Sequence, residues 1–451
     1  MNKDSFSVGI GRRCISPEIP VGLAGYFNVR MWENVLDDIE VRIIILKSGE
    51  TFSAIIQYDL IAVPQGLWEA LLDKMAEIKE LTPDNIIVTA THSHTAPEVR
   101  SSRNGFNPDY IPFVISKTIE ALKDALNDLT ACSIEHGIAE DNRFAFNRRY
   151  WMKNGEVITN PGKLNPEIDR CEGEIDPQIP LIAFSCNGKI KALIVNIVNH
   201  TDTTGGSDIS GDWAGFTIRT LQEKIGSRSM IIPLIGCSGN INHFDIRTNA
   251  DQTCPAEAKR IGTGYAESIE KALTSLCPMK NTELKTYSEQ INIPARVLSF
   301  AEIEEAQMII DKYPDIDVDR VGGPDLTAED LARKTPYALK FFAVSLLKTA
   351  KNNKITKFNL VRIDIGNAVI ASVPCEPFVE IGLTIRKGIF GDRTAMVASL
   401  ANGSGTGYIP NCWNYGRGGY ETTPRSNPYS IETSERLLAA WRKLGTVKES
   451  N

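Results

Sequence analysis

The stretch that decides the fold is Ile86-Ile87-Val88-Thr89-Ala90-Thr91-His92-Ser93-His94. Its first five residues form an apolar run with the length and composition of a buried strand. Alternate residues of an extended chain point to the same side, so both imidazoles can aim at one point just past the strand end. Neutral imidazole is a common zinc ligand. The motif, with two of the five histidines in 451 residues, is compatible with a metal site and equally with a structural histidine pair.

Length and composition exclude several classes of protein. The 451 residues are 42% hydrophobic and 23% charged, as in ordinary globular proteins, and can bury a large core. The net charge of −7 and the absence of a long basic run argue against nucleic-acid binding. No apolar run reaches the roughly 18 residues that a transmembrane segment needs. The N-terminal sequence contains no apolar signal segment, so we expect a cytoplasmic protein as written, or a secreted or periplasmic one if a leader has been removed.

The nine cysteines form no Cys-x-x-Cys pair. We therefore expect neither a disulfide framework nor a four-cysteine zinc site, but reduced and mostly buried thiols. Cys237 and Cys375 lie beside motifs described below, which leaves a catalytic thiol at either position as an alternative.

Apolar runs of strand length alternate with helical patterns along most of the chain, which predicts an α/β protein with a mixed β-sheet core and flanking helices. Residues 299–350 are charged and helical, with capping signals at both Ser299 and Thr327. We expect them to form a helical insertion, either a lid or a packed hairpin. The glycine-rich, aromatic residues 401–430 predict an ordered functional loop. We expect one domain over residues 1–451, with 431–451 as a C-terminal tail.

Four of the apolar runs lead to residue types that bind metals. Residues 86–90 precede His92 and His94, 192–198 precede His200, 368–373 precede Glu376, and 395–400 open the loop that contains Tyr408. In α/β sheets, ligands bind beyond the C-terminal ends of the strands, so we place a metal site there. Histidines with a carboxylate form a catalytic zinc set that leaves room for water. Alternatively, the histidines cap backbone groups and Glu376 caps the helix that we expect at 378–386.

Several further motifs occur in a fixed order. They are Gly9-Ile10-Gly11-Arg12, Ile15-Ser16-Pro17, Leu23-Ala24-Gly25-Tyr26, Thr91 to Pro97, Asn147-Arg148, Glu174-Ile175-Asp176-Pro177, Asn199-His200, Gly236-Cys237-Ser238-Gly239-Asn240, Pro374-Cys375-Glu376-Pro377 and Gly419-Tyr420-Glu421. Together they resemble the catalytic domain of the neutral/alkaline, non-lysosomal ceramidase family, from about residue 7 to about residue 430.

This resemblance implies a catalytic site with one zinc ion per chain, for which another divalent ion is an alternative. The family's metal ligands fall on His92, His200, Glu376 and Tyr408; if Tyr408 were a packing residue, three protein ligands would remain. The family's other active-site groups fall on His94 as an acid/base or a group that orients the substrate, Arg148 beside the substrate carbonyl or oxyanion, and Tyr420 as a hydrogen-bond donor to an oxyanion. The implied activity is a zinc-dependent hydrolase in which metal-activated water attacks an amide (N-acyl) carbonyl of a small-molecule or lipid-like substrate.

Three departures from the family pattern concern the substrate. Glu98-Val99-Arg100 replaces a Gly-Gly stretch, Gly239-Asn240-Ile241-Asn242-His243 lacks the family's serine, and we expect no C-terminal immunoglobulin-like domain. We assign Glu98, Arg100, Asn242 and His243 to the substrate pocket, with a satisfied loop histidine as the alternative for His243. The charged pair favours a polar substrate, so an alternative function is the same metal scaffold acting on a polar, carbohydrate-derived compound. A non-catalytic binding protein is a third hypothesis.

Overall fold

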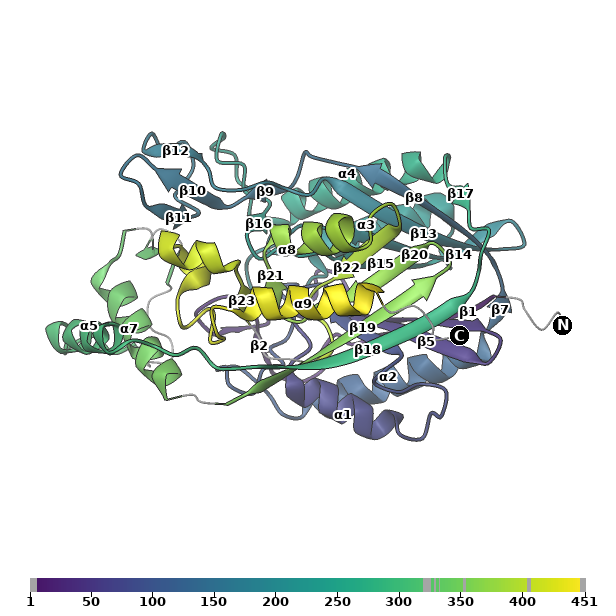
Figure 1. Ribbon diagram of the computed structural model, residues 1–451, viewed down its shortest axis with the longest axis horizontal. Coiled ribbons are helices and arrows are strands. Elements are labelled where there is room, and N and C mark those ends of the chain that lie inside the picture. Colours follow the sequence, from purple (N-terminus) through teal and green to yellow (C-terminus); the bar gives the residue numbers. More distant parts are fainter. Residues whose placement is uncertain are drawn as a thin grey trace.

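The structure is a computed structural model that describes residues 6–318, 326–327, 330–331, 333–351, 354–403 and 407–446 (Figure 1). Three sheets of four or five strands form its centre. Each contains the same kind of unit, in which an antiparallel strand pair is followed by a helix and by a third strand parallel to the second. The expected α/β fold, with mixed sheets and flanking helices, is confirmed.

The first sheet has the strand order β6-β5-β4-β1-β7. Its strands are β1 (Ser7–Cys14), β4 (Glu40–Ser48), β5 (Thr51–Tyr58), β6 (Ile86–Ala90) and β7 (Thr130–Ala131). Helix α1 (Gln65–Met75) connects β5 to the parallel β6, and α2 (Tyr110–Asn127) packs on β1 and β4. Leu67, Trp68 and Leu71 are buried on α1, at the helical spacing that predicted this helix.

The second sheet repeats this unit with the order β15-β14-β13-β8-β17. Its strands are β8 (Ser133–Glu140), β13 (Gln178–Cys186), β14 (Lys189–Ile197), β15 (Met230–Ile235) and β17 (Cys277–Pro278). Helices α3 (Asp212–Ile225) and α4 (Pro255–Leu273) pack against each other and against the sheet. Trp213, Leu221 and Tyr265 fill the space between these helices and the strands.

The third sheet has the order β18-β19-β20-β22. Its strands are β18 (Leu284–Ile293), β19 (Thr356–Ile365), β20 (Ala368–Ser372) and β22 (Thr394–Ala398). The connection from β20 to the parallel β22 contains α8 (Val379–Leu383) and a π-helical turn, η1 (Thr384–Ile389). The segment after residue 430 contains helix α9 (Thr433–Thr446), whose Leu437 and Trp441 are fully buried beside this sheet.

The inner faces of the three sheets share one apolar core. Its fully buried members include Ile44 and Ile87 from the first sheet, Ile194 from the second, and Ile363 and Met396 from the third. Burying this surface against three sheets fixes their mutual orientation, because each side chain must fit between the other two sheets. The segments after β6, β14 and β20 consequently meet at one end of the core.

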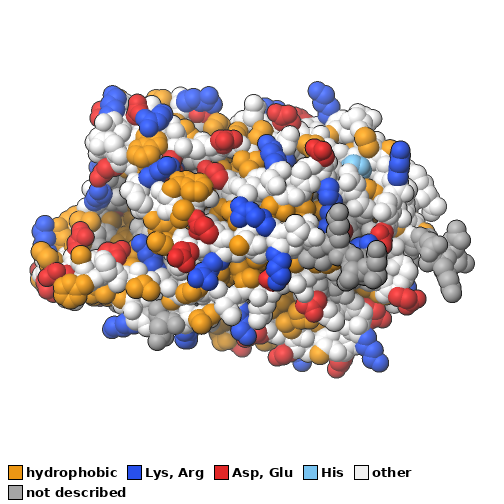
Figure 2. All heavy atoms as spheres, viewed as in Figure 1, with side chains coloured by type: hydrophobic (Ala, Val, Ile, Leu, Met, Phe, Trp, Pro, Cys, Tyr) orange, Lys and Arg blue, Asp and Glu red, His pale blue; other side chains and the backbone are white. Residues whose placement is uncertain are grey.

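The helical insertion between β18 and β19 is confirmed. It contains α5 (Phe300–Lys312) and α7 (Pro336–Ala350), which pack on each other at the left of Figure 1. Ser299 caps α5 together with Glu302 in a capping box. Hydrophobic side chains gather at this end in Figure 2, and Phe300 and Met308 are among the exposed ones.

Short elements complete the description. They are β2 (Gly22–Leu23), β3 (Arg30–Met31), β9 (Phe146–Asn147), β10 (Arg149–Met152), β11 (Val157–Thr159), β12 (Ile168–Cys171), β16 (Ile241–Asn242), β21 (Glu376–Pro377), β23 (Tyr408–Ile409) and the 3₁₀ turns η2 (Cys412–Arg417) and η3 (Tyr420–Thr422). The last three lie in the aromatic loop 401–430, of which residues 404–406 fall outside the described part. None of the described helices is both long and apolar enough to cross a bilayer.

Seven of the nine cysteines are free thiols, as expected, but the expectation that they are mostly buried was wrong. Cys132 and Cys186 form a disulfide, and four of the free thiols are exposed, those of Cys14, Cys171, Cys277 and Cys412. The antiparallel register of β8 and β13 pairs Ser133 with Ser185 and thereby brings the two cysteines together. No spacing rule in the sequence reveals this pair, because its contact depends on strand register across 54 residues.

Candidate metal centre

His92 lies just beyond the end of β6, and the backbone there fixes the direction of its ring. Its N–H donates to the carbonyl of Leu60 (2.9 Å), and its φ of 66° lies in the left-handed region that non-glycine residues rarely adopt. Its Nδ1 lies 2.6 Å from the carbonyl oxygen of Ile61. That contact favours the tautomer with the proton on Nδ1, which leaves the Nε2 lone pair available to a metal ion.

His200 follows β14, and His94 follows His92 by two residues. The indole Nε1 of Trp213 donates to the carbonyl of His200 (2.7 Å) and anchors that backbone to α3. The Nδ1 of His94 lies 3.3 Å from a carboxylate oxygen of Asp202. Gly25 packs against the His94 ring so closely that an added Cβ would lie 2.5 Å from the His94 Cβ, and its φ of 94° also requires glycine.

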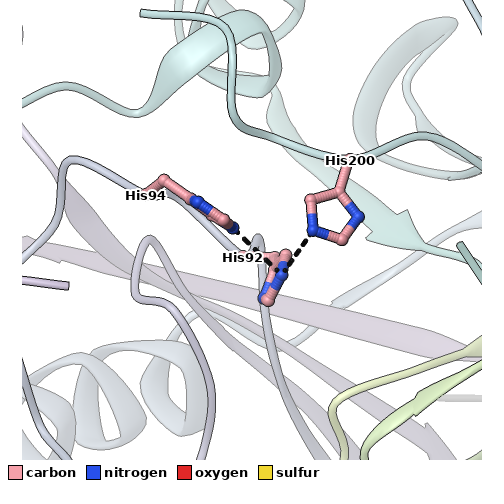
Figure 3. A group of neighbouring side chains, drawn as sticks. All are labelled: His92, His94 and His200. Atoms are coloured by element: carbon pink, nitrogen blue, oxygen red, sulfur yellow. Dashed lines mark hydrogen bonds between the residues drawn. The ribbon is translucent and has the colours of Figure 1, made fainter. Parts of the chain in front are cut away.

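The three imidazoles turn their Nε2 atoms toward one another (Figure 3). The Nε2 of His92 lies 3.1 Å from that of His200 and 3.3 Å from that of His94. Nitrogens bound at about 2.0–2.1 Å to one tetrahedral ion lie about 3.3–3.4 Å apart. The three rings therefore have the spacing of ligands of a single ion, and all three donor atoms lie within 4.8 Å of one another.

Glu376 completes this group of donor atoms. Its Oε2 is 3.3 Å from the Nε2 of His92 and 3.7 Å from that of His200, and it accepts no hydrogen bond within the described residues although it is buried. Burial raises the pKa of Glu376, but His92 and the Arg148 charge outweigh that effect and lower the pKa to about 2. A buried carboxylate oxygen that faces imidazoles and has no hydrogen-bond partner in the described part of the chain fits a divalent cation.

The protonation state of His200 also suits metal binding. Burial, followed by the charges of His92 and Arg148, lowers the pKa of His200 well below its usual value, so this ring is neutral near pH 7.

Glu376 does not cap the helix that follows, because the residue before α8 is Phe378 and the helix has no side-chain cap. The capping alternative for Glu376 is therefore wrong.

Tyr408 is brought beside Glu376 by the parallel pairing of β21 with β23, in which these two residues are partners. Burial and the Glu376 carboxylate raise the pKa of Tyr408 well above its usual value. The guanidinium of Arg148 lies over the Tyr408 ring, 5.2 Å from its centre. Tyr408 therefore lies next to the donor group, and its phenol is neutral unless a cation binds there.

Arg148 is held by buried partners on its other side. Its Nε donates to Glu421 (2.9 Å) and a terminal nitrogen donates to the carbonyl of Gly239 (2.6 Å). Glu421 is fully buried and also accepts from Arg149 (2.8 Å) and Thr159 (2.7 Å). This network fixes Arg148 against Tyr408 rather than in the open part of the cavity.

The donor group opens into a cavity of about 490 Å³. His92, His94, Glu376, Tyr408, Tyr420 and Arg100 are among its lining residues. Glu98 lines an adjoining cavity of about 320 Å³ and binds Arg100 through two contacts of 2.6 and 2.7 Å. Six of the eleven predicted site residues thus line this cavity, and Glu98 lines the adjoining one.

Asn242 and His243 are placed differently and are not among the described residues that line these cavities. The amide of Asn242 donates to Asn160 (2.8 Å). His243 is buried in a loop, with its Nε2 2.6 Å from the carbonyl oxygen of Gln252 and its ring against Phe244. This is the placement of a buried loop histidine, although its Nδ1 has no hydrogen-bond partner among the described residues.

The sequence interpretation missed Asp202, which orients His94, and Glu421, which holds Arg148. Asp202 had a usable signal, since it follows His200 by two residues at the same strand end. Glu421 was noticed only as part of a motif. The two thiols considered as nucleophiles are buried, and burial raises the pKa of both, that of Cys375 to about 12, so neither is a thiolate near pH 7.

Comparison with known proteins confirms the resemblance at the level of the fold. The structure of neutral ceramidase from Pseudomonas aeruginosa matches with a TM-score of 0.69 at 16% identity, over 98% of this chain and 73% of that one. A structure described as ceramidase complexed with C2 matches with a TM-score of 0.71 at 16% identity, over 98% and 75% of the two chains. No protein-family model and no curated protein matches the sequence. The chain therefore has the fold of the neutral ceramidase structures.

Proposed function

We propose that the protein is a zinc-dependent hydrolase that cleaves an N-acyl amide bond. The observation that carries this proposal is the spacing of four donor atoms, the Nε2 atoms of three histidines and the Oε2 of Glu376. Their closest separations, from 3.1 to 3.7 Å, suit ligands of one ion. The ceramidase fold supports hydrolysis of an amide, although a fold alone does not define a reaction.

His92, His200 and Glu376 would hold the ion, and His94 or Tyr408 would complete its coordination. A zinc ion bound there would polarise a carbonyl and lower the pKa of a bound water to about 7. The Asp202 contact suits His94 to either role, since carboxylates orient both metal-binding and proton-transferring histidines. Arg148 would act as a positioning residue for Tyr408, and Tyr420 would donate a hydrogen bond to the oxyanion.

An apolar groove beside the cavity supports an acyl substrate. The groove has a volume of about 370 Å³ and is lined by Ile158, Ile309, Leu339, Phe342 and Leu346, among others. Tyr420 belongs to the walls of both the groove and the metal-site cavity. An acyl chain in the groove could therefore present its carbonyl to the metal centre past this tyrosine.

Metal analysis combined with amide hydrolysis tests the proposal. We expect one zinc ion per chain by elemental analysis, loss of the ion in His200→Ala, and retention in His136→Ala. His136 is a matched control because it lies on β8 and contacts Thr394 rather than the metal centre. Full activity of the metal-free protein on N-acylsphingosine or on short N-acyl amides would refute the mechanism.

The fourth ligand can be identified by anomalous scattering at the zinc edge. Zinc bound with full occupancy in His94→Gln but not in Tyr408→Phe would assign His94 to proton transfer, and the reverse result would make it a ligand. If the unaltered, zinc-loaded protein cleaves no N-acyl compound but binds such compounds, and binds them equally well after His92→Ala, it is a binding protein instead.

A polar substrate remains the second candidate, and the observation that favours it is the charged wall formed by Glu98 and Arg100. A panel of amides, esters and glycosides distinguishes the two candidates. Glycoside cleavage or elimination without amide hydrolysis would favour the polar, carbohydrate-derived substrate.

A further inference from the structure

Two arginines that pair with no described carboxylate lie on the wall of the metal-site cavity. Arg103 and Arg425 line both this cavity and the adjoining one. Within the described residues, neither guanidinium forms an ion pair or a hydrogen bond. Arg425 instead lies over the rings of Phe27 and Phe341, 4.9 and 4.5 Å from their centres. Such stacking holds a guanidinium in place and leaves free its N–H donors, which lie in the plane of the guanidinium group.

The third arginine on this wall, Arg100, does have a carboxylate partner. Arg100 binds Glu98 through two parallel contacts, so its charge is balanced within the protein. Among the described lining residues, the remaining carboxylate is Glu376, which belongs to the donor group of the metal centre. No protein carboxylate in this part of the chain is therefore left for Arg103 and Arg425.

The electrostatic consequence is an unbalanced positive charge in a partly desolvated space. Burial and then the Arg100 charge lower the pKa of Arg103. Burial, followed by the charges of Arg103 and Arg100, lowers the pKa of Arg425 to about 10. Both groups remain cations near pH 7, but each is destabilised by its neighbours, and a bound anion would relieve that repulsion.

We infer that the substrate of the proposed hydrolase carries an anionic group, a carboxylate or a phosphate, which Arg103 and Arg425 bind. Guanidinium groups match both oxyanions through paired N–H donors. Because the two arginines share a cavity with His92, His94 and Glu376, the anion and the scissile bond belong to one small molecule. The inference rests on the proposed function and narrows its substrate class.

The two neighbouring spaces place the anion on the amine part of the substrate. The apolar groove on the other side of Tyr420 suits the acyl chain, whereas the cavity lined by the arginines is charged. The substrate class is therefore an N-acyl amine whose amine part is acidic, such as an N-acylated amino acid. In the hydrolysis, water adds to the carbonyl carbon, the C–N bond breaks and the products are a fatty acid and an anionic amine.

Matched substrates test this inference. N-octanoylglycine and N-octanoylglycinamide differ in one charge, and we expect the zinc-loaded protein to prefer the acid by about 10- to 100-fold in kcat/KM. In Arg103→Gln and in Arg425→Gln the preference should fall toward one, mainly through KM, and the lysine variants should restore part of it. Arg228→Gln is the matched control. Arg228 is an exposed arginine that precedes the first residue of β15, Met230, and we expect its variant to keep the full preference for the acid.

Equal cleavage of the two compounds by the unaltered protein, or an unchanged preference in both glutamine variants, would overturn the inference. N-octanoyl-phosphoethanolamine, compared with N-octanoylglycine, distinguishes phosphate from carboxylate as the bound group.

A binding measurement separates this inference from the proposed function. Calorimetry with inorganic phosphate on the purified full chain should show binding that is lost in the double variant Arg103→Gln/Arg425→Gln and kept in Arg228→Gln. If no amide is cleaved but phosphate binding depends on the two arginines, the proposed function fails and the anion site stands. If amides are cleaved and phosphate binding does not depend on them, the anion site fails alone. Melting temperatures of all variants show whether each is folded.

Discussion

Replacing Glu421 by glutamine removes one negative charge from between two buried arginines. Glu421 and Arg149 are fully buried and Arg148 is 7% exposed. Arg149 keeps a second carboxylate, Glu172, but Arg148 has no other ion pair with a described carboxylate. The variant Glu421→Gln therefore leaves the buried Arg148 guanidinium without its ion-pair partner, while the shape of the side chain is nearly unchanged.

Breaking a buried ion pair from one side costs about 3–5 kcal/mol, because the remaining charge stays desolvated. Unfolding entropy of about 2.1 cal/mol/K per residue gives about 0.95 kcal/mol/K for 451 residues. We therefore expect the melting temperature to fall by about 3–5 °C. Because Arg148 holds Tyr408, we also expect a lower kcat for amide hydrolysis.

Calorimetric melting of the purified protein measures this effect. The matched control is Glu120→Gln, since Glu120 pairs with Arg13 at 3.1 Å but its side chain is 46% exposed. An exposed pair contributes about 0–1 kcal/mol, so the control should shift by about 1 °C or less. A Glu421→Gln melting temperature within about 1 °C of the parent would refute the reasoning that this charge compensates buried arginines.

Three further predictions concern the metal centre and the disulfide. If His94 is a zinc ligand, Asp202→Asn should weaken zinc binding about 10- to 100-fold in a chelator competition, because His94 loses its charged partner; unchanged affinity would show that Asp202 does not orient a metal-bound His94. Since the pKa of His200 is lowered in the fold, the unfolded chain binds the extra proton first. The urea midpoint of the metal-free protein should therefore drop as the pH falls below 6.5, and less so in His200→Gln; equal slopes would argue against it. Cys132→Ser should lower the free energy of unfolding by up to about 4 kcal/mol, because the disulfide no longer closes a loop of 54 residues in the unfolded chain. Reducing agent should destabilise the parent protein but not this variant; equal sensitivity to reductant would contradict the prediction.

Three of the donor residues of the candidate site could be predicted from the strands that precede them. The apolar runs before His92, His200 and Glu376 identified three donors separated by almost 300 residues, because a strand of known polarity places the next residue at a known end of a sheet. The fourth apolar run led only to the loop that contains Tyr408, and the family resemblance was needed to assign this tyrosine as a ligand. The position of His243 was left open, since a loop residue has no periodic pattern to indicate its direction.

The charged wall could not be predicted in the same way. Arg103 and Arg425 follow no motif, and their meeting depends on how the loop after β6 packs against the loop after β23. The disulfide between Cys132 and Cys186 likewise depends on the register of two strands. Long-range pairings of this kind are set by the whole core rather than by local sequence.

The sequence by itself determined the elements and the donor types, because hydrophobic periodicity and residue chemistry are local properties. It predicted the strand 86–90 and placed His92 and His94 just beyond its end. Only the tertiary structure decided that three like units share one core, that four donor atoms lie at ligand spacing, and that two arginines face the same cavity. The physical reason is that these relations arise when three sheets bury their inner faces together, and no segment contains that information alone.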